Sequence, residues 1–195
     1  KVSKMAKELK LPLTCIGIPK TVDNDLPITD CSPGFGSVAK YVATSTLEAG
    51  LDVKSMSETS TKVFILEVMG RHAGWIAAAS ALASTNETDP PHIILMPEVP
   101  FAKKKFIDKV KQTVANEGFC VVVASEGTRY KNGMFLADSG LTDAFGHKQL
   151  GGVAPVLAQM ISSIGLKNHW AVSDYLQRSA RHISSKTDLD QAYAV

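Results

Sequence analysis

Short apolar runs alternate with amphipathic helical patterns along most of this 195-residue chain. Val63–Val68 and Phe119–Ala124 have the length and composition of strands that helices cover on both faces. The segments between such runs carry apolar residues at helical spacing, and strands joined by helices form βαβ units with right-handed crossovers. We therefore predict an α/β fold in which helices lie on both faces of a mostly parallel sheet.

The same pattern predicts where the elements lie. Strands are expected at Leu13–Ile18, Val63–Val68, Ile93–Met96, Phe119–Ala124 and His169–Ser173. Helices are expected at Lys1–Lys10, Phe35–Ala49, Trp75–Ala83, Lys103–Asn116, Val153–Ile164 and after Ser185. Ser32 and Pro33 are expected to start the second helix and Gly50 to end it. Ser185 and Asp188 have the spacing of a capping box, and residues 128–152 are expected to form a long surface excursion.

Composition excludes several kinds of protein. Lys and Arg number 21 against 19 Asp and Glu, and a net charge of +2 indicates neither a nucleic-acid nor a membrane partner. No apolar run approaches the roughly 20 residues that span a bilayer. The 3 cysteines lack CxxC spacing, which argues against a disulfide framework and a cysteine zinc site. We expect a cytoplasmic protein and, because the sequence lacks an initial Met and stops inside a helical pattern, an excerpt of a longer chain.

A polar segment, Pro19–Asp25, follows the first expected strand directly. It offers a cation at Lys20, a hydroxyl at Thr21 and carboxylates at Asp23 and Asp25. Ligands of parallel sheets bind beyond the carboxyl ends of the strands, where a carboxylate can take a proton and a lysine can neutralise a phosphate. The segment is equally typical of an Asx turn that only links a strand to a helix.

A glycine-containing turn, Met69–Gly74, follows the strand Val63–Val68. Its glycines allow a ligand close to the backbone, and Arg71 can bind a phosphate or carboxylate with two hydrogen bonds. A tight turn with a surface arginine is the alternative. The turn is neither a GxGxxG fingerprint nor a Walker A loop, so it predicts no nucleotide.

Two further polar segments follow later strands. Glu126 can accept hydrogen bonds from sugar hydroxyls, or it can be an exposed loop acid. Tyr175–Arg178, with Arg181 and His182 nearby, can clamp a phosphate, although a solvated surface is equally compatible. Four such segments at successive strand ends of one sheet favour a shared ligand site more strongly than any one of them alone.

These segments together resemble the phosphofructokinases. Gly17–Asp25 (GIPKTVDND) resembles the family's P-K-T-I-D-N-D catalytic segment, and Val68–Ala77 is similar to its sugar-phosphate motif; Ser125–Gly127 and Tyr175–Arg178 continue the match. The resemblance covers essentially the whole chain. It implies a Rossmann-like three-layer αβα architecture with a mostly parallel sheet, as part of a two-domain fold. Residues 1–28 would form the edge of the first, phosphate-donor domain, residues 29–168 the sugar-phosphate-binding domain, and residues 169–195 the return towards the first.

The resemblance also implies an activity. It is transfer of a phosphoryl group to the 1-hydroxyl of fructose 6-phosphate, with Mg²⁺, to give fructose 1,6-bisphosphate in glycolysis. Lys20 favours pyrophosphate as the donor, because ATP-dependent bacterial members typically have Gly there, although some ATP-dependent relatives also carry Lys. The upstream Gly-Gly-Asp motif that would decide between the donors is not in this sequence. An ATP-dependent kinase and a non-catalytic sugar-phosphate-binding regulatory subunit stay open, although Asp23, Asp25 and Arg71 together argue against the latter.

The family pattern assigns roles to individual residues. Asp23 would be the general base, supported by Asp25 and Thr21, with Lys20 as a further catalytic residue. Asp25 would be directed towards Mg²⁺, whose main ligand is expected upstream of this chain. The implied substrate-binding residues are Thr21, Val22, Lys62, Met69, Gly70, Arg71, Glu126, Tyr175 and Arg178. Lys62 and His169 replace arginines that reach a neighbouring subunit's sugar phosphate, so a homodimer or homotetramer is expected. Asp174-Tyr175 stands where Gly-His is commoner in short bacterial members, which suggests the pyrophosphate-type branch.

Overall fold

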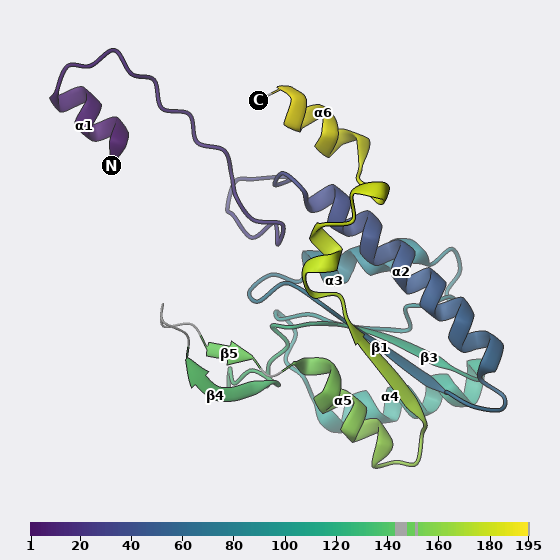
Figure 1. Ribbon diagram of the computed structural model, residues 1–195. Coiled ribbons are helices and arrows are strands. Elements are labelled where there is room, and N and C mark those ends of the chain that lie inside the picture. Colours follow the sequence, from purple (N-terminus) through teal and green to yellow (C-terminus); the bar gives the residue numbers. More distant parts are fainter. Residues whose placement is uncertain (143–147, 151, 195) are drawn as a thin grey trace.

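A four-stranded parallel sheet forms the centre of the protein (Figure 1). The computed structural model describes residues 1–142, 148–150 and 152–194. The strand order is β2 (Ile93–Leu95), β3 (Cys120–Ser125), β1 (Val63–Val68) and β6 (Asn168–Val172), and each neighbouring pair is parallel. The predicted parallel α/β sheet is confirmed.

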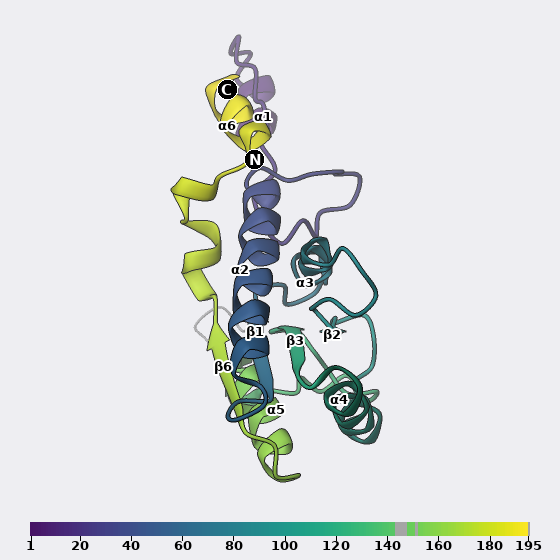
Figure 2. The ribbon, with the colours of Figure 1, turned by 90° about the vertical axis from the view of Figure 1, so that its right-hand side faces the viewer.

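Helices cover both faces of this sheet. α2 (Phe35–Met56) and α3 (Trp75–Ala79), which continues as a 3₁₀ turn over Ser80–Ala83, lie on one face. On the opposite face lie α4 (Lys103–Glu117) and α5 (Val153–Ser162) (Figures 1 and 2). This arrangement is the three-layer αβα architecture that the resemblance implied.

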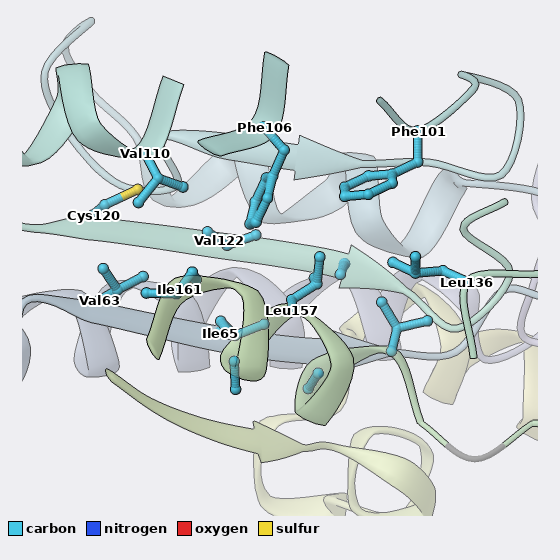
Figure 3. Packing of buried hydrophobic residues seen from close by; sticks show 14 of the residues in the cluster. Val63, Ile65, Phe101, Phe106, Val110, Cys120, Val122, Leu136, Leu157 and Ile161 are labelled. Carbon is cyan, nitrogen blue, oxygen red and sulfur yellow. The ribbon is translucent and has the colours of Figure 1, made fainter. Parts of the chain in front are cut away.

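Each helical layer packs against the sheet through a buried apolar cluster. On the α4–α5 face, Val110, Leu157 and Ile161 pack against the inner strands β1 and β3 (Figure 3). On the α2–α3 face, Val42 and Ile76 pack against the same two strands. Because burying one such side chain contributes about 1.5–3 kcal/mol, the two clusters make the sheet a firm base for the loops at its carboxyl edge.

The expected strand Leu13–Ile18 is not formed. The segment runs extended from α1 (Val2–Glu8) without pairing to the sheet, and Ile16 is 86% exposed (Figure 1). A strand needs a neighbour that takes up its backbone hydrogen bonds, and apolar sequence alone cannot supply one. This prediction was wrong for the described chain.

Gly50 does not end α2, which continues to Met56. A Cβ atom at position 50 would lie 2.5 Å from Cγ of Pro90, so glycine is needed there because another segment packs directly against the helix. The residue that resembled a stop signal is therefore a packing site. Gly118, by contrast, ends α4 with φ +81°, as expected.

The start of α2 is capped from outside the helix. Gly34 is its N-cap, and Ser32, the expected cap, has a buried hydroxyl without a hydrogen-bond partner among the described residues. Instead, the Asp188 carboxylate accepts hydrogen bonds from Gly34 N (2.9 Å) and from Ser37 N (2.6 Å). A carboxylate at a helix N-terminus satisfies free N–H groups and the helix dipole.

Asp188 belongs to α6 (Lys186–Ala194), near the end of the chain. The predicted capping box is formed on one side, since Asp188 N donates to Ser185 Oγ at 3.2 Å. Burial acts to raise the pKa of Asp188, but the hydrogen bonds from Ser37 and Gly34 outweigh it and hold the pKa below its usual value. The same carboxylate thus joins the last helix to the start of α2.

The expected surface excursion contains an antiparallel pair, β4 (Asp138–Thr142) and β5 (Lys148–Leu150). Residues 143–147 and 151 of that excursion lie outside the described residues. Short 3₁₀ turns at Asp174–Arg178 and Arg181–Ile183 lead from β6 to α6. In the described part of the chain, no helix is long and apolar enough to cross a membrane. The division of the chain between two domains stays a prediction.

Candidate functional site

A cavity of about 790 Å³ opens beyond the carboxyl ends of β1 and β3. All four polar segments contribute to its wall. The lining includes nine of the implied site residues, namely Lys20, Thr21, Val22, Asp23, Met69, Arg71, Glu126, Tyr175 and Arg178. Segments that are distant in sequence thus meet at one edge of the sheet, where ligands of parallel α/β proteins bind.

Turn chemistry shapes the segment that carries Asp23. Thr21 Oγ1 accepts a hydrogen bond from Asp23 N at 3.1 Å. Buried Asn24 binds its own loop on both sides, accepting from Ser32 N (2.8 Å) and donating to the Asp30 carbonyl (3.1 Å). The turn is formed by the Thr21 hydroxyl and is an ST turn, not the Asx turn that the sequence suggested as the alternative. It lies within the segment that lines the cleft.

Asp23 is half-buried at the cleft wall. Burial raises the pKa of its carboxyl, and the neighbouring charge of Asp25 raises it further, whereas Lys20 and the nearby arginines oppose the rise. A carboxylate with a raised pKa is a better proton acceptor than an exposed aspartate, since a general base works best with a pKa nearer the operating pH.

The turn that carries Arg71 is fixed by close backbone packing. Gly70 has φ +123°, and Ser125 Oγ donates a hydrogen bond to its carbonyl oxygen. A Cβ atom on Gly127 would collide with the Arg71 carbonyl oxygen, so the loops after β1 and β3 touch only because glycine is present. Arg129 Nη2 also donates to the Arg71 carbonyl, at 3.1 Å.

The cations of the cleft retain capacity to bind a ligand. Arg71 Nε is buried and takes no hydrogen-bond partner among the described residues. The guanidinium of Arg178 lies 4.6 Å from the centre of the Tyr175 ring, and both side chains are exposed. A buried donor without a partner is costly, and an anionic ligand would satisfy it.

Glu126 lies beside these cations. Its backbone N donates to the Val68 carbonyl at 2.9 Å, which ties the loop after β3 to the end of β1. Burial raises the pKa of the Glu126 carboxyl, although Arg71 acts to lower it. The residue is placed to accept hydrogen bonds from a polyhydroxylated ligand held next to Arg71.

Three implied site residues lie elsewhere. Gly70 is buried behind the cleft wall, and Asp25 is exposed and does not line the cavity. Lys62 precedes β1, so it lies at the amino edge of the sheet, about 20 Å from the cleft by the rise of the strand. His169, on β6, is exposed. A contribution of Lys62 or His169 to a second subunit stays a prediction.

Several residues that were not predicted as site residues also contribute. Pro33 and His72 line the cavity, and so does Asp174, which has φ +39°. Glu67 adjoins a second cavity of about 390 Å³, which shares Met69, Glu126 and Asp174 with the first. For Asp174, the position directly after the last expected strand was the one signal in the sequence that it could belong to the site. Glu67, a buried glutamate inside an apolar strand, carried no such signal.

Such an arrangement, with paired cations and carboxylates at the strand ends of an αβα layer structure, is typical of α/β proteins that bind an anionic ligand. The phosphofructokinase family matches residues 1–191. The chain therefore belongs to the phosphofructokinase family, as the motifs indicated.

Individual relatives are close. The chain is 66% identical to a pyrophosphate–fructose 6-phosphate 1-phosphotransferase of Halomonas elongata and 59% identical to one of Methylococcus capsulatus. Each match covers 100% of this chain and 47% of the relative. A crystal structure of the pyrophosphate-dependent phosphofructokinase of Marinobacter aquaeolei superposes with a TM-score of 0.86 at 62% identity, covering 100% of this chain and 45% of that one. The chain thus spans about half the length of the relatives it matches.

Proposed function

We propose that the full-length protein transfers a phosphoryl group from pyrophosphate to the 1-hydroxyl of fructose 6-phosphate. The product is fructose 1,6-bisphosphate, and the reaction is a reversible step of glycolysis in the cytoplasm. The observation that carries the proposal is the shared cleft, which holds a half-buried carboxylate, Asp23, together with Arg71 and Arg178. The names of the two relatives support the same reaction.

The chemistry of the step suits these groups. Asp23 takes the proton as the 1-hydroxyl oxygen forms its bond to phosphorus, while the bond from phosphorus to the leaving phosphate breaks. Phosphoryl transfer has a loose transition state, so catalysis consists mainly of positioning and charge neutralisation. Arg71 and Arg178 bind the 6-phosphate, and Glu126 accepts a hydrogen bond from a sugar hydroxyl.

Mg²⁺ is the proposed cofactor, and when bound it neutralises charge on the transferring phosphate. Among the described residues, no group of three or more His, Cys, Asp or Glu could hold a metal ion. Mg²⁺ commonly takes one or two carboxylates and completes its shell with phosphates and water, so the residues present fit a minor role as ligands. Asp25, which is exposed, is the proposed Mg²⁺ ligand.

Lys20 supports pyrophosphate as the donor. It lines the same cavity as Asp23, and its compact ammonium can offset charge on the leaving phosphate. The proposed assembly is a homodimer or homotetramer, in which Lys62 and His169 serve a neighbouring subunit's site, in keeping with their distance from this cleft.

The test is the rate of fructose 1,6-bisphosphate formation by the full-length protein with fructose 6-phosphate, Mg²⁺ and either pyrophosphate or ATP. The proposal predicts turnover with pyrophosphate and at most a trace with ATP. Turnover with ATP alone would overturn the donor assignment. Binding of fructose 6-phosphate without turnover with either donor would indicate a regulatory subunit instead.

A further inference from the structure

The side chain of Gln177 lies between two of the segments that line the cleft. It is 1% exposed, although it belongs to the 3₁₀ turn whose neighbours Tyr175 and Arg178 are exposed. Its Oε1 accepts a hydrogen bond from Met69 N at 3.2 Å, and its Nε2 donates to the Asp174 carbonyl at 2.8 Å. Because Gln177 and Asp174 belong to the same 3₁₀ turn, the donor bond braces that turn, and the acceptor bond ties the turn to Met69.

Each of the two segments contains a residue with a positive φ. The turn after β1 passes through Gly70, which has φ +123°. The turn after β6 begins at Asp174, a residue with a Cβ atom and φ +39°. Glycine adopts a positive φ without strain, whereas the conformation of Asp174 persists only where surrounding contacts hold it. The two hydrogen bonds of Gln177 act one residue before Gly70 and directly on Asp174.

The link connects the two cations of the cleft. Met69 is two residues from Arg71, and Asp174 is four residues from Arg178. In the part of the chain that the structure describes, the bond from Met69 N to Gln177 Oε1 is the one side-chain hydrogen bond between these two turns. Their relative position therefore depends on this amide and on the backbone bond from Ser173 N to the Glu67 carbonyl, at 2.9 Å.

We propose that Gln177 is a positioning residue, whose buried amide sets the spacing of Arg71 and Arg178 so that both reach one sugar phosphate. The inference rests on the proposed function, because it assigns the acceptor to this cleft. Arg71 and Arg178 line one cavity with Lys20 and Asp23. The bonds of Gln177, however, reach only the turns that carry the two arginines, and not the Lys20–Asp23 segment. Removing the amide should therefore weaken the acceptor and leave the donor unaffected.

Two variants separate the parts of the link. Gln177→Leu is similar in size and removes both hydrogen bonds. Gln177→Glu keeps the acceptor for Met69 N, but its carboxylate cannot donate to the Asp174 carbonyl. Thr113→Val is the matched control, since Thr113 is a buried polar residue of α4, 6% exposed, and lines neither the cleft nor the cavity behind it.

The experiment measures fructose 6-phosphate binding by calorimetry and both Michaelis constants by steady-state kinetics on the full-length protein. For Gln177→Leu we expect the Kd and KM for fructose 6-phosphate to rise by about tenfold, which corresponds to losing the one hydrogen bond that joins the two turns. The KM for pyrophosphate should stay within about twofold, since the amide acts only on the acceptor side. Gln177→Glu keeps the bond from Met69 N and loses only the local bond to Asp174, so it should show a smaller rise, specific to fructose 6-phosphate. It replaces the leucine variant if that variant does not fold.

The outcomes separate this inference from the proposed function. An unchanged Kd in a folded variant overturns the role of Gln177, as do equal rises in both Michaelis constants or an acceptor-specific rise in Thr113→Val. If the wild-type protein binds fructose 6-phosphate without turnover, the proposed reaction fails, and the Kd comparison still decides on Gln177. If it binds no fructose 6-phosphate at all, both proposals fail.

Discussion

At the residue scale, the cleft depends on charges that are held partly away from water. Asp23 is close enough to Asp25 for the second carboxylate to raise its pKa, while Lys20, Arg71 and Arg178 oppose that effect. Burial is the largest cause of the rise. Without burial and the charge of Asp25, the neighbouring cations would keep the Asp23 carboxyl fully ionised in acid. With them, Asp23 is able to accept a proton although it lies beside these cations.

This balance predicts a pH dependence. As the base, Asp23 must be ionised, so kcat/KM should fall as the pH drops through its pKa, which lies above the usual value of 3.8. Asp25→Asn removes the neighbouring negative charge and should shift the acid limb of the pH–rate profile to lower pH. Asp30→Asn, an exposed aspartate in the same loop, is the control and should not move the limb. An acid limb that is unmoved in Asp25→Asn would contradict the proposed coupling.

The chemical roles of single residues could be predicted from the sequence better than the hydrogen bonds between residues that are distant in the chain. The cation, hydroxyl and carboxylate of the Lys20–Asp23 segment could be predicted as a group because they follow one another in the chain. The role of Gln177 could not, since it depends on Met69, which is distant in sequence and reached only through the fold. Asp174 was noticed only as a departure from the family pattern, because a positive φ leaves no mark in the residue types.

At the element scale, Gly50 shows that helix propensity and helix packing can have opposite effects. Alanine in place of a helical glycine normally gains about 1 kcal/mol. Here its Cβ would lie 2.5 Å from Cγ of Pro90, and overpacking typically costs about 1–3 kcal/mol. The cost exceeds the gain, so we expect Gly50→Ala to lower the free energy of unfolding by up to about 2 kcal/mol, measured by urea denaturation. Thr44→Ala on the exposed side of α2 is the control, and a stabilised Gly50→Ala would contradict the packing role.

The attachment of α6 to α2 gives a second prediction at this scale. Asp188→Asn keeps the size of the side chain but loses the charge that strengthens its bonds to Gly34 and Ser37. We expect a loss of about 1–2 kcal/mol and faster amide exchange in α6 at neutral pH. Since the folded pKa is lowered, this contribution is present above the usual value of 3.8 and is lost as the pH falls through the lowered one.

The matched control is Asp190→Asn. Among the described residues, Asp190 pairs only with Lys186, on the exposed surface of α6, so its loss should change stability by a few tenths of a kcal/mol at most. If Asp188→Asn and Asp190→Asn exchange amide protons in α6 at the same rate, the Asp188 carboxylate does not hold the helix.

Hydrophobic periodicity correctly predicted the strands and helices of the core, but it failed for a segment whose structure depends on a neighbouring strand. β1, β3, α4 and α5 are close to their expected bounds, because their apolar faces pack against one another. Leu13–Ile18 has the same apolar character, yet it pairs with no strand in the described chain. An apolar run predicts burial, but only a neighbour in the sheet makes it a strand.

At the scale of the whole molecule, the parallel sheet explains why four separate segments form one cleft. Strands that run in the same direction end at the same edge, so the residues after β1, β3 and β6 meet there. The Lys20–Asp23 segment reaches the same edge from the N-terminal side, next to the start of α2 that Asp188 caps. The fold thus brings the proposed base and the proposed phosphate-binding arginines together.

The most direct test of this account is Asp23→Asn in the full-length protein, with turnover and fructose 6-phosphate binding measured on the same sample. An amide of the same shape cannot take the proton of the sugar hydroxyl, so kcat should fall by on the order of 10²-fold or more. Calorimetry should give a Kd within about twofold of the wild type, because Arg71 and Arg178 still bind the phosphate. Turnover at the wild-type rate would contradict the account by removing Asp23 from the reaction.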